Sequence, residues 1–476
     1  MRLTAIVPAA AAVPAGIMAH LTARSQLRAA AAVAAGTAVV WLVLGRGYLG
    51  YDTEWALVWG GQLAGGELPD YSAVLITPTP HPLANAVGAL LSPLGDARPT
   101  ILLVAHAAAL VTLAYQLFEL GRVLIAWPVG ALAAALVLTR PALVEQTLYA
   151  SPDVFFLALV ASAAAAEARR PRRGASVLVL LGLAGLLRPE GWLLAAAYTV
   201  YLLAASDRRR RPRLVALGAA APVVWALADL IVTGDPFYSR HSTVQITTAL
   251  NPGGRSGPSG LAALPDHLRD ALTGPVAVFG VAGLVSGLWF LRRRVLLPAA
   301  ICGLGMGAFL ALGLADVPRL TRYAMLPASM LVLFCGVTAF GWLGVESRPR
   351  LRRVWILAAL AVPAVLIPSL RDDLQRIDRV AELSHRAGES VRDLDRLAET
   401  PAVRAASRRC RAVFVATFGY RPQVALALDR EPKEILVDVP DPPARGLAIL
   451  PVGTLRPRGF EPVAASRLWT VTERCP

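Results

Sequence analysis

Two carboxylates follow the first long apolar segment, and a third stands at the start of a later one. Asp52 and Glu54 come soon after residues 29–45, and Asp153 begins residues 152–168. A carboxylate at the rim of an apolar layer can remove a proton from an approaching hydroxyl group. Unpaired inside the layer it would cost about 2.5–3.5 kcal/mol, so Asp153 should lie near the interface or have a partner. Asp153 either takes part in chemistry or caps a helix.

Two arginines stand at the start of another apolar segment. Arg319 and Arg322 are three residues apart, just before residues 324–345, and Tyr323 follows them directly. Residues at this spacing can share one face of a helix. Guanidinium groups bind phosphate with two parallel hydrogen bonds at fixed geometry. The pair is therefore a candidate anion site, and the alternative is an anchor among lipid headgroups.

The overall composition is that of a polytopic membrane protein. Of the 476 residues, 56% are hydrophobic and only 17% are charged, and the mean hydropathy is +0.55. These values exclude an ordinary soluble globular protein. The net charge of +15 comes from arginines in short clusters between apolar runs, which is the pattern of cytoplasmic membrane loops. We therefore expect no nucleic acid partner.

Apolar segments of spanning or near-spanning length recur along the chain, so the predicted fold class is all-α and polytopic. A bilayer core of about 30 Å needs about 20 apolar residues in a helix. The eleven segments lie at about residues 29–45, 100–118, 123–139, 152–168, 175–187, 191–205, 214–233, 275–291, 295–314, 324–345 and 354–369. Segments 175–187 and 191–205 are short and form either two tilted spans or a re-entrant hairpin. Residues 5–20 are a twelfth span, an interfacial helix or a cleaved signal peptide, with the uncleaved forms favoured.

The basic clusters predict the orientation in the plasma membrane. They lie at about 24–28, 169–173, 208–213, 292–294 and 348–353. Placing all of them in the cytoplasm lets the eleven spans alternate without conflict. The N-terminus is then cytoplasmic, and the external loops are about 46–99 and 234–274. Residues 1–370 form the membrane domain, and residues 371–476 lie outside the cell.

Residues 371–476 change composition sharply and predict a small α/β domain on the external side. The segment opens with a charged amphipathic helical pattern and continues with short apolar runs at 412–418, 434–439, 446–452 and 468–473 that are typical of strands. Cys410 and Cys475 bracket these runs on the oxidising side of the membrane, where a disulfide can form. Cys302 and Cys335 lie inside predicted spans and are expected to pack as small apolar residues.

Five motifs occur in an order that resembles superfamily C glycosyltransferases. These integral-membrane enzymes use polyprenyl-phosphate sugars and include the protein O-mannosyltransferase and lipid A aminoarabinose transferase relatives. The motifs are G-Y-D-T-E-W through L-P-D-Y at 50–71, Y-A-S-P-D-V-F-F at 149–156, L-L-R-P-E-G-W at 186–192, G-D-P-F-Y-S-R-H-S-T at 234–243 and P-R-L-T-R-Y-A at 318–324. Many relatives have adjacent Asp-Glu in the first motif, whereas Thr53 separates the two acids here.

The resemblance implies a donor whose lipid lies in the bilayer and whose phosphate and sugar lie at the outer rim. Asp52 is then the candidate base of an inverting transfer, with Asp153 and Glu54 as further catalytic candidates. Arg322 and Arg319, with Tyr323, would neutralise the phosphate. The implied partners are the polyprenyl-phosphate sugar, with mannose or another hexose or pentose, the lipid bilayer, and a glycan, lipid or protein acceptor.

Four further side chains are candidates for donor contact. Arg188 and Glu190 either pair as a structural brace or contact the donor. His81 and His241 lie in external loops and either bind phosphate or sugar or are solvated. No two histidines have metal-ligand spacing, so we predict no zinc site and no certain cofactor, although a divalent cation bridging Asp52 and the phosphate remains open.

The competing interpretation is a transporter or lipid flippase that catalyses no glycosyl transfer. Transporters tend to hold ionisable groups near the middle of the membrane on broken helices and to show repeated halves. Here the acids and isolated arginines gather at one rim, and no repeat is evident in the sequence. The pattern therefore favours the glycosyltransferase.

Overall fold

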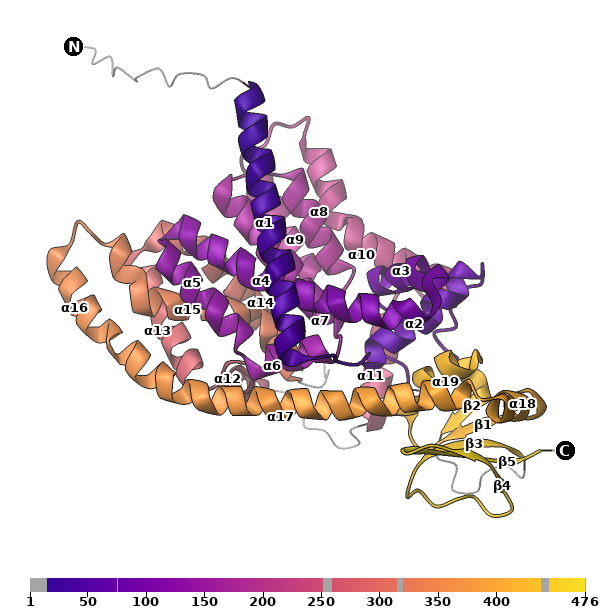
Figure 1. The fold of residues 1–476 in the computed structure, drawn as a ribbon. Helices are drawn as coiled ribbons and strands as arrows, with labels where there is room; N and C mark the ends of the chain where they lie inside the picture. Colours follow the sequence, from indigo (N-terminus) through magenta and orange to yellow (C-terminus); the bar gives the residue numbers. More distant parts are fainter. Residues whose placement is uncertain (1–14, 75, 251–258, 315–319, 438–444, 476) are drawn as a thin grey trace, which may run out of the picture.

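The computed structural model describes residues 15–74, 76–250, 259–314, 320–437 and 445–475, and these residues are largely helical (Figure 1). The N-terminal half contains α1 Ala15–Leu44, α2 Tyr51–Ala64, α3 Pro82–Leu91, α4 Arg98–Leu124, α5 Trp127–Leu138, α6 Pro141–Leu148, α7 Pro152–Arg169, α8 Ala175–Gly185, α9 Glu190–Leu203 and α10 Arg211–Thr233. Residues 5–14 of the predicted N-terminal segment lie outside the described part. Prolines begin many of these helices, where the missing N–H costs nothing.

The second half continues the bundle and then leaves it. Its helices are α11 Tyr238–Leu250, α12 Ser259–Leu272, α13 Gly274–Phe290, α14 Leu296–Leu314, α15 Met325–Phe340, α16 Pro349–Ala359, α17 Ala361–Ala398, α18 Pro401–Arg409 and α19 Arg421–Leu428. A 3-10 helix, Thr321–Ala324, leads into α15. Each predicted apolar segment coincides with one of these helices or with two consecutive ones.

The sequence and the structure give different numbers of membrane spans. Within the described residues, five helices are long and apolar enough to cross a membrane, or up to seven if each of two bent helix pairs is one span. Helices such as Ala175–Gly185 are apolar but shorter. The protein is thus a multi-pass membrane protein, and the figure of eleven spans stays a prediction.

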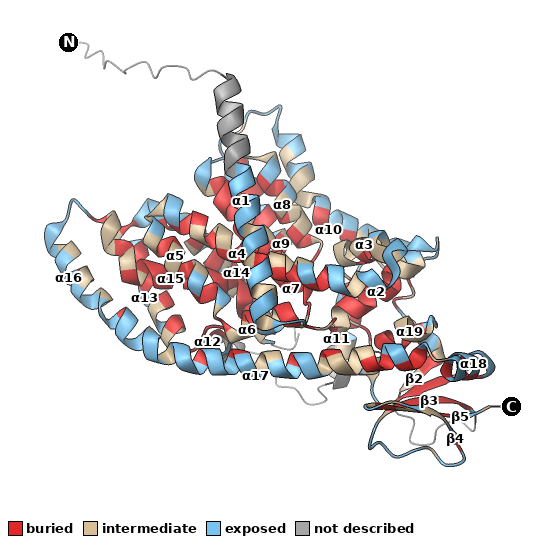
Figure 2. Ribbon diagram, viewed as in Figure 1, coloured by how far each residue is buried: buried red, intermediate tan, exposed pale blue. Residues whose placement is uncertain are grey.

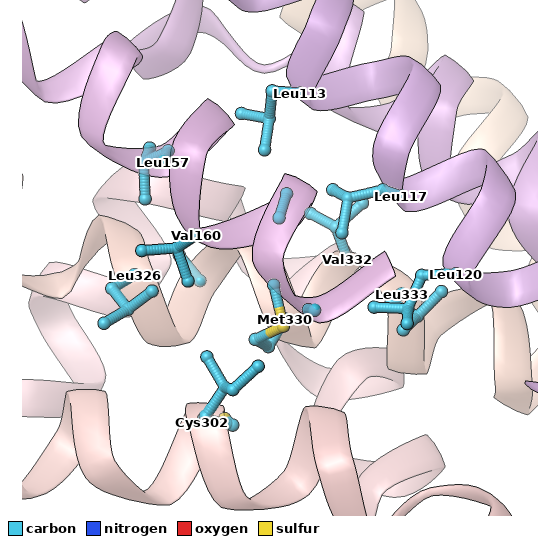
Figure 3. Packing of buried hydrophobic residues seen from close by; sticks show 14 of the residues in the cluster. Leu113, Leu117, Leu120, Leu157, Val160, Cys302, Leu326, Met330, Val332 and Leu333 are labelled. Atoms are coloured by element: carbon cyan, nitrogen blue, oxygen red, sulfur yellow. The ribbon is translucent and has the colours of Figure 1, made fainter. Parts of the chain in front are cut away.

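The bundle core is apolar and closely packed. Figure 3 shows leucines of α4 meeting side chains of α7, α14 and α15, among them Leu113, Leu157, Cys302 and Met330. Glycines let the helix backbones touch, because a Cβ atom added to Gly283 would lie 1.8 Å from a carbonyl oxygen of α15. Small residues at helix contacts are typical of membrane bundles, where packing drives association.

The outer surfaces of several helices are apolar and exposed, as expected for contact with lipid. Figure 2 shows exposed residues along α1 and α17 and buried residues concentrated inside the bundle. Leu42 and Val43 of α1 are 81% and 75% exposed, and Ile367 of α17 is 69% exposed. Exposed apolar side chains in such number would be a liability in water, so they indicate a bilayer.

Helix α17 is a long strap that connects the bundle to the C-terminal sheet. It runs along one side of the bundle in Figure 1 and ends beside the strands. Its first residues are apolar and its later residues are charged, so one helix crosses the boundary predicted at residues 370 and 371. Asp373 near its start forms a buried ion pair with Arg140, with a nitrogen-oxygen distance of 2.8 Å.

The C-terminal segment forms a five-stranded mixed sheet. Its strands are β1 Val413–Val415, β2 Ile435–Val437, β3 Gly446–Pro451, β4 Glu461–Ala465 and β5 Trp469–Arg474, in the order β2-β1-β3-β5-β4. β2, β1 and β3 are parallel, and β5 is antiparallel to both β3 and β4. Four of these strands lie at the predicted runs, whereas β4 was not predicted. The structure contains a Cys410–Cys475 disulfide that links the two ends of this region.

The sheet and the segment between α1 and α4 share one hydrophobic core. Trp55 and Trp59 of α2 pack in the same cluster as Leu394 of α17 and Val413 and Ile449 of the sheet. The rings of Trp55 and Trp59 lie 5.1 Å apart. The C-terminal region is therefore fixed against the helix that carries the first acidic motif.

Candidate active site

The start of α2 is fixed against the turn that precedes α7. The backbone N–H of Tyr48 donates to the carbonyl of Leu148 at 2.8 Å, and the Thr53 hydroxyl donates to the carbonyl of Ala150 at 2.5 Å. Gly47 permits this approach, because an added Cβ atom would lie 2.0 Å from the Leu148 carbonyl oxygen. The first acidic motif consequently lies beside the second one.

Asp52 forms an ion pair with Arg322. The arginine Nη1 donates to the aspartate Oδ2 at 2.8 Å, and the side chains are 13% and 32% exposed for Asp52 and Arg322 respectively. Asp52 is the second residue of α2, and Arg322 lies on the 3-10 helix before α15. The two motifs at opposite ends of the membrane region therefore meet, and their contact is partly open to a ligand.

Asp153 and Arg188 form a second, more deeply buried ion pair. Asp153 stands in the first turn of α7, where its N–H donates to the Ser151 hydroxyl at 3.3 Å. Arg188 contacts the carboxylate of Asp153, and its Nη2 lies 2.6 Å from Oε1 of Glu190. One guanidinium thus joins the start of α7 to the break between α8 and α9. This arrangement provides the partner that a buried Asp153 requires.

Tyr323 connects the two ion pairs. The guanidinium of Arg188 lies 4.9 Å from the centre of its ring, and that of Arg322 lies 5.5 Å away. A cation over an aromatic face is held by the ring quadrupole. Within the described residues, this cluster contains three carboxylates and two guanidiniums. The carboxylates belong to Asp52, Asp153 and Glu190, so negative groups outnumber positive ones.

His81 lies beside the same cluster. It precedes α3, and its ring is 5.8 Å from that of Trp225. Burial lowers the pKa of His81, while the charges of Asp52 and Arg322 act on it in opposite directions. The histidine is thus neutral near pH 7, which suits it to hydrogen bonding with a ligand.

Three buried polar atoms of the cluster have no hydrogen-bond partner among the described residues. They are Oδ2 of Asp153, Nε of Arg322 and Nδ1 of His81. A buried polar atom without a partner typically costs about 1–3 kcal/mol. Their convergence in one place indicates a site that a polar ligand completes.

Other predicted residues lie outside the cluster. Glu54 is buried on another side of α2, and burial together with Asp395 raises its pKa well above the ordinary value. His241 is exposed and pairs with Asp235 at 2.6 Å, within the loop 234–243. Arg319 is not among the described residues, so its position stays a prediction.

The segment after α10 packs onto the segment after α2. The Tyr238 hydroxyl donates to the carbonyl of Tyr71 at 2.8 Å, and the rings of these two tyrosines stack 6.1 Å apart. Asp229 accepts hydrogen bonds from the N–H and hydroxyl of Ser239 at 2.9 and 2.8 Å. This motif therefore supports the segment after α2.

Two features of the site region were not predicted from sequence. Tyr149 accepts a hydrogen bond from the N–H of Tyr51 at 3.0 Å, which fixes the start of α2. The position of Tyr149 in the Y-A-S-P-D motif was the sequence signal that could have identified it. Arg140 and Asp373 gave no such signal, because their partners lie far away in sequence. No group of three or more His, Cys, Asp or Glu side chains in the described chain is arranged to hold a metal ion.

The chain matches known proteins in one sequence family and in overall fold. A sequence model of the dolichyl-phosphate-mannose-protein mannosyltransferase family matches residues 78–230. The structure of ArnT from Cupriavidus metallidurans bound to undecaprenyl phosphate is similar, with a TM-score of 0.54, 17% identity, and coverage of 93% of this chain and 97% of that chain. Among curated proteins, none matches the chain significantly.

Two further solved structures resemble the chain more weakly. ArnT from Cupriavidus metallidurans in the apo state has a TM-score of 0.49 and 15% identity, covering 94% of this chain and 98% of that chain. The Archaeoglobus fulgidus oligosaccharyltransferase in complex with Zn and sulfate has a TM-score of 0.49 and 12% identity, covering 81% of this chain and 58% of that chain.

The partial family match and the overall fold both point to integral-membrane glycosyltransferases of superfamily C. The family match and the fold of ArnT confirm the resemblance that the five motifs predict. The chain is accordingly a glycosyltransferase.

Proposed function

We propose that the protein transfers a sugar from a polyprenyl-phosphate donor to an acceptor outside the cell, with inversion at the anomeric carbon. The observation that carries the proposal is the contact between Asp52 and Arg322. It places a candidate base beside a residue that would bind the donor phosphate, at one rim of the helix bundle. The ArnT structure of the same fold contains undecaprenyl phosphate, and the matching family is described by dolichyl-phosphate-mannose. Mannose is therefore the first donor sugar to test.

In the proposed reaction the acceptor hydroxyl oxygen forms a bond to the anomeric carbon. The bond between that carbon and the phosphate oxygen breaks, and its electron pair leaves with the polyprenyl phosphate. The hydroxyl proton passes to the carboxylate of Asp52. Arg322 stabilises the charge that develops on the leaving phosphate, because a guanidinium needs no proton transfer to do so.

The charge balance of the cluster favours a further cation at the phosphate. Three carboxylates face two guanidiniums, so a donor phosphate would add negative charge to a region that already has an excess. We assign the additional positive charge to Arg319. His81 and Tyr323 would donate or accept hydrogen bonds around the phosphate and sugar.

We also propose that the basic loops are cytoplasmic and that residues 371–476 form an external domain on the membrane domain 1–370. Arg172, Arg293 and Arg294 line one cavity of about 820 Å³, so two basic clusters meet at the same end of the bundle. Asp153 stands at the other end of α7, which has 18 residues and is therefore about 27 Å long. A cysteine placed near Lys433 should be labelled from outside intact cells. Labelling only from the cytoplasmic side would show that the proposed membrane orientation is wrong.

The decisive experiment is transfer from labelled polyprenyl-phosphate mannose, arabinose and glucose, each added in turn to purified membranes. One donor should yield labelled acceptor, and Asp52→Asn should lower the rate about 10²–10⁴-fold, the usual contribution of a general base. Asp96→Asn is the matched control, because Asp96 is an exposed acid of the same external segment. Movement of the lipid across vesicles without sugar transfer from any donor would favour the transporter instead.

A further inference from the structure

A cavity lies where α2, α17 and the C-terminal sheet region meet, and its lining includes Tyr51, which directly precedes the candidate base in sequence. It has a volume of about 430 Å³, within the range of small-molecule sites, roughly 300–1,000 Å³. Residues of four separate parts of the chain line it. They are Tyr48, Leu49, Tyr51, Glu54, Tyr149, Ala387, Ser390, Val391, Phe418, Tyr420 and Gln423, with Gly419 between the last aromatic pair.

Aromatic rings form much of its wall. The rings of Tyr51 and Phe418 lie 5.8 Å apart, edge to face, and those of Tyr48 and Tyr149 lie 5.5 Å apart in the same manner. Tyr420 is itself held edge-on against Trp469 at 4.9 Å. Rings fixed in this way present flat apolar faces together with hydroxyl groups.

Two buried polar side chains lie in the wall, and one of them has an unpaired nitrogen. Gln423 is 7% exposed, and its Nε2 has no hydrogen bond within the described structure. Glu54 is 6% exposed and also lines the cavity. Leaving a buried amide nitrogen unpaired is costly, so Gln423 is placed for a ligand that brings an acceptor, with Glu54 in the same wall.

The lining contains no lysine, arginine or histidine among the residues that the structure describes. A phosphorylated or carboxylated ligand would therefore meet no basic side chain in the lining and would lie next to the carboxyl group of Glu54. Flat apolar faces combined with an amide, a carboxyl group and phenolic hydroxyls instead match a neutral sugar ring, which has apolar C–H faces and hydroxyls at its edge.

The position relative to Asp52 assigns a role to this sugar. Tyr51 and Glu54 line the cavity on either side of Asp52 in sequence. Tyr149, also in the wall, accepts the hydrogen bond of the Tyr51 N–H at the start of α2. We infer that this cavity binds the acceptor and that the acceptor is a neutral glycan, held by Glu54 and Gln423 with one hydroxyl directed toward Asp52. The inference rests on the proposed glycosyl transfer.

The inference also accounts for the C-terminal sheet region. Phe418 and Gln423 come from the segment between β1 and β2, so the membrane bundle by itself supplies only part of the wall. The hydrophobic core shared by α2 and the sheet would then hold the two halves of the site in register.

The test uses the purified full-length protein and three neutral disaccharides, mannobiose, arabinobiose and maltose. Without donor, one of them should raise the thermal unfolding temperature of the wild type. Gln423→Leu should raise the KM for that disaccharide about tenfold, equivalent to about 1.4 kcal/mol, while the donor KM and the kcat at saturating acceptor stay near wild type. Gln375→Leu, an exposed glutamine on α17, is the matched control.

The results separate this inference from the proposed function. Transfer that depends on Asp52 but shows an unchanged acceptor KM in Gln423→Leu would overturn the acceptor site alone. Selective transfer to a serine-containing peptide or an anionic glycolipid, with no response to the disaccharides, would overturn the glycan assignment. Disaccharide binding that Gln423→Leu abolishes, without transfer from any donor, would support the site and refute the transferase reaction.

Discussion

Arg322 donates a hydrogen bond to Asp52 at 2.8 Å, although 270 positions of the chain separate them. Without donor, this contact holds the carboxylate beside the guanidinium. A donor phosphate would compete for the same guanidinium, because both are oxyanions. Binding of the phosphate would thus release the carboxylate to accept a proton from the acceptor.

Replacement of Arg322 tests this relationship directly. Arg322→Ala should lower kcat about 10²–10³-fold, the effect of removing one donor to a developing charge. Arg322→Lys should fall between Ala and the wild type, because the charge remains but the two-pronged geometry is lost. Initial rates at saturating donor provide the measurement, and Arg240→Lys is an exposed control. Wild-type turnover in both variants would show that Arg322 does not assist the transfer and would favour an anchoring role among lipid headgroups.

Asp153→Ala should destabilise the protein as well as inactivate it. Its removal leaves the buried guanidinium of Arg188 with Glu190 alone. Breaking a buried ion pair from one side typically costs about 3–5 kcal/mol. Thermal unfolding in detergent should therefore show a clear loss for Asp153→Ala and a smaller one for Asp153→Asn. Full stability combined with lost transfer would instead make Asp153 a catalytic residue rather than a brace.

The pH dependence of stability should report on Glu54. Burial and the nearby Asp395 raise the pKa of Glu54 well above its ordinary value of 4.5, so the folded state holds a proton that the unfolded state releases. The contribution to the free energy of unfolding is complete below pH 4.5 and is lost as pH rises through the folded pKa, by up to about 1.4 kcal/mol per pH unit. Glu54→Gln should flatten this slope in unfolding curves. Glu145→Gln is the control. If the free energy of unfolding of Glu54→Gln depends on pH as steeply as that of the wild type, the pKa of Glu54 is not raised.

The motifs predicted side chains that lie together in the structure, because each motif lies at the end of an apolar segment, and the roles of these side chains stay predictions. Asp52, Asp153, Arg188, Arg322 and His81 meet in the structure, as expected for side chains placed at a common rim. Which of them pair could not be read from sequence, because pairing depends on how helices far apart in the chain pack. Glu54 shows the same limit, since it follows Asp52 by only two positions yet is buried on another side of α2.

The sequence predicted where most helices and strands lie along the chain, but it did not predict how they are arranged in space. Apolar runs located the helices, and alternating short runs located four of the five strands. Strand β4 was missed because its sequence, Glu461–Ala465, begins with Glu and Pro and has a single β-branched residue, so it has few of the residue types enriched in strands. The continuous helix α17 was also hidden, because its pattern changes from apolar to charged within one element.

The disulfide between Cys410 and Cys475 should make the C-terminal region sensitive to reduction. The two cysteines are 65 positions apart, and closing a loop of that length is worth about 4 kcal/mol in the chain-entropy model. Replacing both by serine should lower the unfolding temperature of the C-terminal region and expose it to protease. The wild type under reducing conditions should behave like the serine variant. Equal protease resistance of all samples would show that the bridge contributes little.

The ion pair between Arg140 and Asp373 should anchor the strap helix to the bundle. Both side chains are almost fully buried, at 1% and 2% exposed, and the Arg140 Nη1 also donates to the Leu272 carbonyl at 2.7 Å and the Thr273 hydroxyl at 2.8 Å. Asp373→Ala leaves the guanidinium without its countercharge, so we expect a loss of about 3–5 kcal/mol in stability.

The double variant Arg140→Met with Asp373→Leu removes both charges and should recover most of that loss, since an apolar pair avoids the desolvation of two ions. Asp372→Ala is the control, because this neighbouring acid is exposed. Thermal unfolding of the purified protein in detergent measures all three. Because α17 also lines the proposed acceptor cavity, Asp373→Ala should raise the acceptor KM, and the double variant should restore it. An unchanged unfolding temperature in Asp373→Ala would show that the strap is held by its apolar contacts alone.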